Sequence, residues 1–408
     1  MHTIPELDHL DLMSRAFRTE PYPVYAELRR AGPVCRVRLG DNDSMLLISR
    51  HGDVVAALKD ARFGTEDPTA ATASQDQLPP QIRELQALQR HWMLFANPPR
   101  HTRLRGLVHQ AFTPRMVQAL VAQIETTANT LLDAVAGQAD FDLIAGYAHP
   151  LPVDVIALIL GIPIADRAAF SRWSVALGGT LDPTADIEAL LQGGDAAIAF
   201  DAYLRRLIDE RRAHLGDDLL SALIQAEQTG DRLSEDELIA TCVLLLLAGH
   251  ETTQNLIGNG VHALLRHPEQ LSRLRGEPAL MKPAIEELLR FDSPVQFTSR
   301  CLREDVRLGE IDLPRGMRVG LMIGSAHRDS SAFADPDGLD LAREHNPHVA
   351  FGAGIHFCLG AMLARTEAAI ALRVLLSRLP GLALADGATP VYRDMLTLRG
   401  LQALPVRG

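Results

Sequence analysis

The sequence predicts a mainly α-helical fold with a small β-rich lobe. Between about residues 98 and 291, apolar positions recur at helical spacing with only short breaks. Strand patterns are confined to two regions: residues 34–39 and 45–49 near the start, and residues 306–311 and 317–323 later on. One long helical region and two short strand regions indicate an α-rich body that carries a minor sheet.

Turn signals connect these elements. Residues 40–43, Gly-Asp-Asn-Asp, predict a hairpin turn, and residues 313–316, Leu-Pro-Arg-Gly, predict a turn between the later strands. Residues 67–80 are rich in Ala, Thr, Pro and Gln, so we expect a mobile loop there. Because no repeat, low-complexity tract or linker interrupts the chain, we expect residues 1–408 to form a single domain.

Composition narrows the class of protein. The chain has 408 residues, of which 47% are hydrophobic and 22% charged, so it can bury a large core. A net charge of −11 argues against nucleic acid or an anionic membrane as a general partner. The densest apolar run, residues 243–248, is much shorter than the roughly 20 residues that span a bilayer. We therefore expect no membrane association.

Two further features of the sequence indicate the cellular compartment of the protein. The first residues carry acids where a signal peptide would carry a basic region and an apolar core. Four cysteines are spread over the whole chain, which indicates a reducing compartment rather than a disulfide framework: Cys35, Cys242, Cys301 and Cys358. We expect a cytoplasmic protein.

A long helix is predicted between residues 233 and 268. Ser234 and Glu237 form a capping box, and no breaker follows until Pro268. A helix of about 30 residues is ~45 Å long at 1.5 Å per residue, enough to cross a domain of this size. Its centre, residues 244–247, consists of four leucines and should be buried on all sides.

Polar side chains interrupt this helix directly after the leucines. Residues 248–253 read Ala-Gly-His-Glu-Thr-Thr, and buried polar groups cost free energy unless they are satisfied. One interpretation is a kink in which threonine hydroxyls bond to carbonyls four residues earlier. A metalloprotease HExxH motif is excluded, because Gln254 stands where the second histidine is needed. The functional interpretation is a carboxylate, Glu251, beside a hydroxyl, Thr252, that deliver protons in a dry cavity.

A lone cysteine lies in a glycine-rich stretch near the C-terminus. Residues 351–360 read Phe-Gly-Ala-Gly-Ile-His-Phe-Cys-Leu-Gly and precede an apolar helical run. A helix N-terminus after Cys358 is expected to lower the pKa of the thiol and to aim N–H groups at the sulfur. The plain alternative is a buried cysteine beside a turn. A dinucleotide fingerprint fails because Phe357 occupies its last glycine position, and structural zinc is disfavoured because the chain has no CxxC.

The remaining option is haem iron held by one thiolate. Residues 351–360 resemble, position for position, the haem-binding loop of the cytochrome P-450 monooxygenases. The resemblance implies the cytochrome P-450 fold and haem b (iron protoporphyrin IX), with Cys358 as the metal ligand. It places Phe351, Gly352, His356 and Gly360 around the haem.

The helix segment 248–253 matches the same family. In members of that family, the corresponding segment lies over the haem on the side opposite the thiolate. By this resemblance Ala248 and Gly249 leave a groove for dioxygen, Thr252 hydrogen-bonds to the oxygen ligand, and Glu251 relays protons from solvent.

A further motif is Glu287-Leu288-Leu289-Arg290. Its two charges share a helix face, which on spacing alone is a surface ion pair of little energetic weight, and Glu286 is also within reach of Arg290. The family carries E-x-x-R here, closed into a buried triad by an arginine that Arg343 matches. The resemblance therefore gives Glu287, Arg290 and Arg343 a structural role.

Cations for the two haem propionates are expected on a helix that begins after Asn97-Pro98-Pro99. His101 and Arg105 share one face of it, a pattern that by itself is usually a solvated surface. The segment resembles the family's propionate-binding helix, and Arg300 and His356 match the remaining propionate positions.

The resemblance implies an enzyme that inserts one oxygen atom of O2 into a hydrophobic small-molecule substrate, with hydroxylation as the default. Electrons come from a separate ferredoxin or flavodoxin with an NAD(P)H-dependent reductase, which we expect to dock near Arg100, Arg103 and Arg365 of a monomer. The family topology implies a substrate pocket lined by Leu94, Phe95, Leu244, Leu247, Ala248, Val295, Gln296, Phe297 and Leu396.

Two alternatives stay open at this point. One is a haem enzyme that uses or rearranges a peroxide without external electrons; the Glu251-Thr252 pair argues against it. The other is a non-catalytic haem sensor, which leaves the polar interruption of the long helix unexplained.

Overall fold

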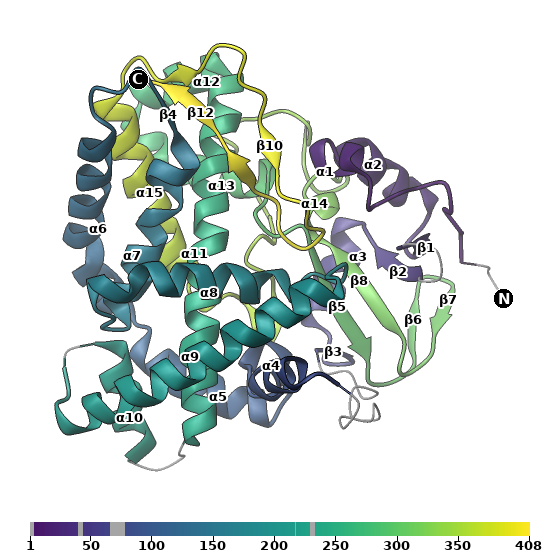
Figure 1. Ribbon diagram of the computed structural model, residues 1–408. Helices are drawn as coiled ribbons and strands as arrows, with labels where there is room; N and C mark the ends of the chain where they lie inside the picture. Colours follow the sequence, from purple (N-terminus) through teal and green to yellow (C-terminus); the bar gives the residue numbers. More distant parts are fainter. Residues whose placement is uncertain (1–3, 40–43, 66–77, 217, 229–232) are drawn as a thin grey trace.

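The computed structural model describes residues 4–39, 44–65, 78–216, 218–228 and 233–408. Figure 1 shows a large helical body beside a smaller lobe that contains most of the sheet and the N-terminal helices. The predicted mainly α fold with a small β-rich lobe is confirmed. The predicted hairpin turn at residues 40–43, and residues 67–77 of the predicted mobile loop, lie outside the described residues.

The helices follow the predicted distribution, and most lie between residues 80 and 291. They are α1 (Arg15–Thr19), α2 (Tyr22–Ala31), α3 (His51–Lys59), α4 (Pro80–Arg90), α5 (Arg100–Ala111), α6 (Pro114–Val135), α7 (Pro150–Ile159), α8 (Arg167–Gly179), α9 (Ile187–Ala213), α10 (Leu219–Gln228), α11 (Glu235–Arg266), α12 (Pro268–Gly276), α13 (Met281–Phe291), α14 (Ile323–Ala326) and α15 (Ala361–Arg378), with short turns at Met93–Phe95, Ile144–Ala148, Ile164–Asp166, Pro278–Leu280 and Gly354–His356.

The strands form one larger sheet and several small ones. They are β1 (Cys35–Arg38), β2 (Ser44–Ile48), β3 (Phe63–Gly64), β4 (Asp140–Asp142), β5 (Phe297–Leu302), β6 (Val306–Leu308), β7 (Ile311–Leu313), β8 (Arg318–Met322), β9 (Ala383–Leu384), β10 (Val391–Tyr392), β11 (Leu401–Ala403) and β12 (Pro405–Arg407). The larger sheet has the order β1-β2-β8-β5-β3, with β1 antiparallel to β2 as predicted and β2 parallel to β8.

Three details of the strand prediction are wrong. The predicted single strand 306–311 is a hairpin of β6 and β7, because Gly309 adopts φ +59° and turns the chain between them. Second, β3, β5 and β9 to β12 lie outside the two predicted strand regions. The third correction concerns β4, a short strand inside the region predicted to be helical. It pairs with β12 at the far C-terminus, a partner that local sequence patterns do not reveal.

Helix α11 confirms the predicted long helix. The Ser234 side chain accepts from the N–H of Glu237, and the Glu237 side chain accepts from the N–H of Ser234, so both halves of the capping box form. The 32 residues make a rod about 48 Å long. It crosses the helical body and packs against α7, α8, α13 and α15.

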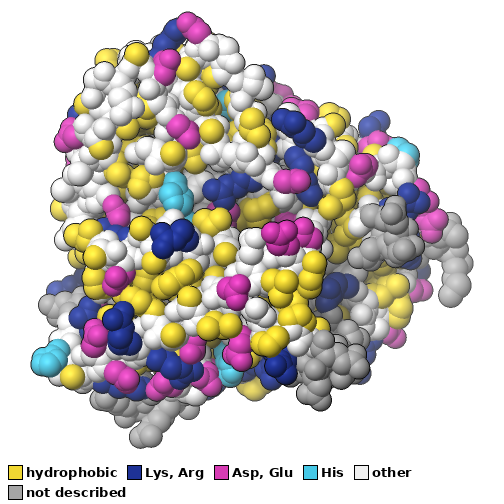
Figure 2. Space-filling view, viewed as in Figure 1, with side chains coloured by type: hydrophobic (Ala, Val, Ile, Leu, Met, Phe, Trp, Pro, Cys, Tyr) yellow, Lys and Arg dark blue, Asp and Glu magenta, His cyan; other side chains and the backbone are white. Residues whose placement is uncertain are grey.

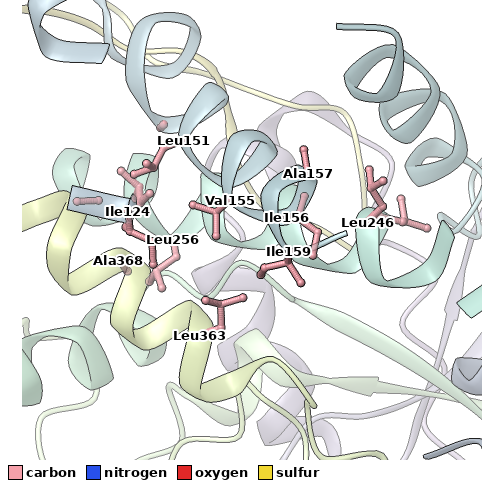
Figure 3. Packing of buried hydrophobic residues seen from close by; sticks show 14 of the residues in the cluster. Ile124, Leu151, Val155, Ile156, Ala157, Ile159, Leu246, Leu256, Leu363 and Ala368 are labelled. Atoms are coloured by element: carbon pink, nitrogen blue, oxygen red, sulfur yellow. The ribbon is translucent and has the colours of Figure 1, made fainter. Parts of the chain in front are cut away.

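The core of the helical body surrounds α11. In Figure 3, Ile124 of α6, Val155 of α7, Leu256 of α11 and Ala368 of α15 meet in one apolar layer. Burying each large aliphatic side chain stabilises the fold by roughly 1.5–3 kcal/mol. This packing fixes α15 against α11, and so fixes the Cys358 loop, which immediately precedes α15.

Candidate active site

The Cys358 loop is held in a defined turn. Gly352 and Gly354 adopt φ +70° and +67°, a conformation that disfavours other residues. A Cβ on Gly354 would lie 2.5 Å from the carbonyl oxygen of Leu58, so glycine also permits the loop to approach α3. The Cys358 N–H donates to the Phe351 carbonyl at 2.9 Å, which closes the loop.

The Cys358 side chain has many neighbouring atoms but also exposed surface. Burial raises the pKa of its thiol, while the N–H of Gly360 and the charges of Arg105 and Arg365 act in the opposite direction. The predicted N–H contact is present, but the expected net lowering of the thiol pKa is wrong, because loss of solvation outweighs it. The residue nevertheless has exposed surface, and a Cβ on Gly360 would meet no atom within 4 Å. Space therefore adjoins the sulfur.

Four basic residues converge beside this loop. Arg105 Nη2 donates to the Phe357 carbonyl at 2.6 Å, and the rings of His101 and His356 lie 4.3 Å apart. Burial, followed by the charges of His101, Arg300 and Arg105, lowers the pKa of His356 to about 3. The pKa of His101 is also lowered, and burial lowers that of Arg300 to about 10. The two histidines are therefore neutral near pH 7, and an anionic ligand here would offset the charges of Arg105 and Arg300.

One buried atom of this cluster also lacks a partner. His101 is 2% exposed, and its Nε2 makes no hydrogen bond. An unpaired buried polar atom is costly, so a ligand acceptor or donor at this point would stabilise the cluster.

Helix α11 presents a stripe of accessible residues within its buried centre. Ala248 is exposed and Gly249 and Thr252 are half-buried, whereas His250, Glu251 and Thr253 between and beside them are buried. Spacings of one and four residues place the three accessible positions on one face of the helix. This face of α11 is therefore accessible within an otherwise buried stretch of helix.

The threonine hydroxyls bond to their own helix. Thr252 Oγ1 donates to the Ala248 carbonyl at 2.9 Å, and Thr253 Oγ1 donates to the Gly249 carbonyl at 3.1 Å. These are the hydrogen bonds expected from the kink interpretation. They leave the Thr252 oxygen able to accept a hydrogen bond, and a rotation about χ1 frees its proton for another acceptor.

Glu251 points away from this stripe. Its carboxylate is 3% exposed and pairs with Arg393, whose Nη1 donates to Oε1 at 2.5 Å. Burial raises the pKa of Glu251, and Arg393 opposes the rise. The sequence analysis missed Arg393, because 142 positions separate the two residues and no local pattern connects them.

The predicted structural triad is buried as expected. Glu287 accepts two hydrogen bonds from Arg290, at 2.7 and 2.8 Å, and one from Arg343 Nε at 3.0 Å. The remaining donors of Arg290 reach the carbonyls of His327, Pro336 and Gly338. The triad ties α13 to the segment that leads into the Cys358 loop.

Comparisons with known proteins agree with this geometry. The family model for cytochrome P450 matches residues 189–381. The cytochrome P450 monooxygenase PikC of Streptomyces venezuelae is 42% identical over 409 residues, covering 99% of this chain and 94% of that relative.

This chain belongs to the cytochrome P450 family. A second relative, 6-deoxyerythronolide B hydroxylase of Saccharopolyspora erythraea, is 38% identical over 412 residues, which cover 100% of this chain and 99% of that relative. Among solved structures, P450BioI in complex with acyl carrier protein ligated to hexadec-9Z-enoic acid is 40% identical with a TM-score of 0.90, covering 97% and 100% of the two chains. As a cytochrome P450, the protein is a haem monooxygenase, an oxidoreductase that uses dioxygen and a substrate.

The residues of this cytochrome P450 fit the haem that the family implies. Cys358 offers a sulfur beside open space, and the two positive charges of Arg105 and Arg300, next to His101 and His356, match two negatively charged propionates. Ala248 and Gly249 leave the accessible face of α11 free of bulky side chains. Among the helices of the described ranges, none is long and apolar enough to cross a membrane.

Two of the arginines predicted for redox-partner docking are paired within the cytochrome P450 itself. Arg365 donates to both oxygens of Glu286, at 2.7 and 2.8 Å, and lies over the ring of Phe351 at 4.3 Å. Arg103 forms an ion pair with Glu237. Their charges are therefore partly neutralised, a feature that the sequence analysis did not anticipate. Arg100 is half-buried.

The predicted substrate wall divides into two groups. Leu94 is exposed, Phe95 and Val295 are half-buried, and Leu244 and Leu247 are buried on α11 beside Ala248. Gln296 and Phe297 instead have partners in the smaller lobe: Gln296 Oε1 accepts from the Tyr25 hydroxyl at 2.7 Å, and Phe297 packs over Gly320 of β8. Leu396 is buried near them.

Proposed function

We propose that this cytochrome P450 hydroxylates a hydrophobic small molecule, using haem b and electrons from a separate ferredoxin or flavodoxin. Two observations support the proposal: an exposed cysteine beside a basic cluster, and an accessible Ala-Gly-Thr stripe on an otherwise buried helix. When bound, the haem supplies the chemistry that splits dioxygen and inserts one oxygen atom into the substrate. The protein residues bind the haem, orient the substrate and deliver protons.

In this proposal Cys358 holds the iron as a thiolate. Phe351, Gly352 and Gly360 shape the loop around it, since glycine leaves room for a flat ligand against the backbone. The propionates are received by the basic cluster, whose members are His101, Arg105, Arg300 and His356. An anion there also relieves the unpaired Nε2 of His101.

Thr252 and Glu251 are proposed to deliver protons. Thr252 lies on the accessible stripe, where its hydroxyl can turn from the Ala248 carbonyl toward the reacting oxygen. Glu251 is buried, with its pKa raised, so its carboxyl group can take up a proton closer to neutral pH than an exposed glutamate. Ala248 and Gly249 keep this face open for dioxygen.

The substrate is proposed to lie against an apolar wall on the same side as Thr252. Leu94, Phe95, Leu244, Leu247, Ala248 and Val295 would provide it, with Leu396 near its edge, whereas the protein contacts of Gln296 and Phe297 favour a packing role. The names of the relatives support an apolar substrate: one acts on 6-deoxyerythronolide B, and another binds a carrier-linked unsaturated fatty acid.

We further propose that residues 1–408 form one domain that acts as a cytoplasmic monomer. The four cysteines are all unpaired, which suits a reducing compartment. An acidic redox partner would approach the side of the Cys358 loop near Arg100, Arg103 and Arg365, although Arg103 and Arg365 are partly neutralised by Glu237 and Glu286.

The test uses the purified holoenzyme. A library of fatty acids, macrolactones and steroids is screened for shifts of the haem absorption, and each hit is incubated with a ferredoxin, its reductase, NAD(P)H and 18O2. A product that carries one 18O atom supports the proposal. Turnover with hydrogen peroxide but none with NAD(P)H and reductase would instead identify a peroxide-using enzyme, and spectral binding without any product would identify a sensor.

A further inference from the structure

A buried arginine in the smaller lobe has two donors without a hydrogen-bond partner in the described part of the chain. Arg18 lies on α1, which contacts β10 (Figure 1), and its side chain is 5% exposed. Its Nε and Nη1 make no hydrogen bond there, and its Nη2 reaches the sulfur of Met13 at 3.8 Å. A guanidinium is always charged, and its donors are normally satisfied when they are buried. Two strong donors are therefore left for a ligand.

The counter-charge of Arg18 is weak. It belongs to Asp394, whose Oδ1 lies 3.2 Å from Nε but without the alignment of a hydrogen bond. The Asp394 side chain is 82% exposed, so water solvates this carboxylate and competes with the arginine for it. The buried charge of Arg18 is thus only partly compensated within the protein, which is costly unless an anion completes the pairing.

A small cavity lies beside this arginine. Its volume is about 20 Å³, which suits one water molecule or a single-atom ion and is too small for sulfate, phosphate or a carboxylate. Three arginines line it, Arg18, Arg393 and Arg399, and the rest of the lining that the structure describes includes no acidic side chain. The cavity therefore has a positively charged wall.

Two of these three arginines already have buried counter-charges. Arg399 Nε donates to Asp292 Oδ1 at 2.6 Å, and its Nη1 and Nη2 donate to the last two carbonyls of α1. Arg393 forms an ion pair with Glu251, whose side chain is 3% exposed. The positive charge that remains on the cavity wall is consequently that of Arg18.

The hydrogen bonds on the lining favour an anion over a water molecule. The Tyr25 hydroxyl donates to Gln296 Oε1 at 2.7 Å, and Gln296 Nε2 donates to the Ser293 carbonyl at 2.7 Å. A buried water needs acceptors for its two protons as well as donors, and the Gln296 oxygen is already in use. A halide ion needs donors alone, and Arg18 provides two.

We propose that this cavity binds one chloride ion, held by Nε and Nη1 of Arg18. The ion neutralises the buried guanidinium and competes with Asp394 for it. Because the cavity lies between α1 and residues 392–399, the bound ion also stabilises the N-terminal helices against this C-terminal segment. Leu396, near the edge of the proposed substrate wall, belongs to the same lining.

Bromide, a heavier halide of the same charge, locates the site. Crystals of the haem-bound protein are soaked in sodium bromide, and anomalous diffraction is recorded near the bromine absorption edge. We expect a peak within hydrogen-bonding distance of Arg18 Nε and Nη1. The peak should disappear in Arg18→Gln and persist in Asp394→Asn, because the carboxylate competes with the ion rather than holding it.

Thermal unfolding of the holoenzyme measures binding in solution and needs no substrate. Chloride is raised from about 5 to about 500 mM while the ionic strength is kept constant with methanesulfonate, which is too large for the cavity. We expect the melting temperature of the wild type to rise by about 2 °C or more. Arg18→Gln should show no such rise, and Asp394→Asn should reach half of its rise at a several-fold lower chloride concentration. Arg407→Gln, which removes an arginine paired with the exposed Asp386, is the matched control and should respond like the wild type.

The outcomes decide the proposal. A bromide peak at Arg18, together with a chloride response that Arg18→Gln loses, supports it. A wild-type melting temperature that responds equally to chloride and methanesulfonate overturns it even where the crystal shows bromide, since the ion would then bind at crystal concentration only. Density that refines as water, or a chloride response that Arg18→Gln retains, overturns it as well. Should Arg18→Gln fail to fold, the wild-type bromide peak and the chloride midpoint of Asp394→Asn decide in its place, and an unchanged midpoint counts against the site.

Discussion

Two buried glutamate–arginine pairs in this molecule have very different surroundings. Glu287 accepts from Arg290, Arg343, the N–H of Asp340 and Asn346, and is enclosed on every side. Glu251 has Arg393 alone as its ion-pair partner among the described residues, and Arg393 reaches it from a segment at the surface. The number of partners decides whether a buried charge is fixed or able to move: the first pair suits a scaffold, the second a relay.

Removing one member of the scaffold pair should have the largest effect. Glu287→Ala leaves two buried arginines without a counter-charge, a loss of roughly 3–5 kcal/mol, and Arg290→Ala leaves the opposite charge unpaired. We expect poor haem incorporation and aggregation, measured by the ratio of haem to protein absorption and by thermal unfolding. Soluble, haem-replete variants that melt like the wild type would show that the triad contributes little.

A third buried glutamate, Glu367, has no ion-pair partner among the described residues and so extends the comparison to an unpaired carboxyl group. Glu367 on α15 is 2% exposed, its Oε1 has no hydrogen-bond partner, and burial raises its pKa to about 8. The folded-state pKa lies above the unfolded value, so the wild type loses stability as the pH rises from about 5 to 8, by about 1.4 kcal/mol per unit.

Glu367→Gln removes that pH dependence. Its melting temperature should match the wild type near pH 5 and exceed it at pH 7.5, with a difference in unfolding free energy on the order of 3 kcal/mol. Denaturant unfolding at both pH values measures this. A difference that is the same at pH 5 and pH 7.5 would show that Glu367 does not titrate in this range.

How far the sequence predicts these regions depends on how local their signals are. The capping box of α11, the spacing of Glu287 and Arg290, and the glycines around Cys358 are all contained within a few residues, and the structure confirms their geometry. The pairs Glu251–Arg393 and β4–β12 join positions more than 100 residues apart, so the sequence pattern of either member says nothing of the other. The thiol pKa was mispredicted because burial depends on the whole fold.

A smaller effect is expected for a substitution of Thr252, the neighbour of Glu251. Thr252→Ala removes a hydroxyl from the accessible stripe but leaves the Glu251–Arg393 pair intact. The variant should bind substrate and oxidise NAD(P)H at near wild-type rates. Product per NAD(P)H should fall several-fold and hydrogen peroxide per NAD(P)H should rise, because without this proton donor more of the reduced dioxygen leaves as peroxide.

Thr253→Ala is the matched control for this prediction, because its hydroxyl makes the same type of backbone bond from a buried position. Parallel measurement of cofactor oxidation, peroxide and product distinguishes the two variants. Equal coupling in Thr252→Ala and the wild type would assign the donor to another group.

The central claim is that Cys358 holds the haem iron as a thiolate, and the absorption of the reduced carbon monoxide complex tests it most directly. The purified wild-type protein should show the red-shifted band that thiolate donation produces, and Cys358→His should lose this band even where haem is retained. A wild-type spectrum like that of a histidine-ligated haem protein, or a red-shifted band that persists in Cys358→His, would contradict the account.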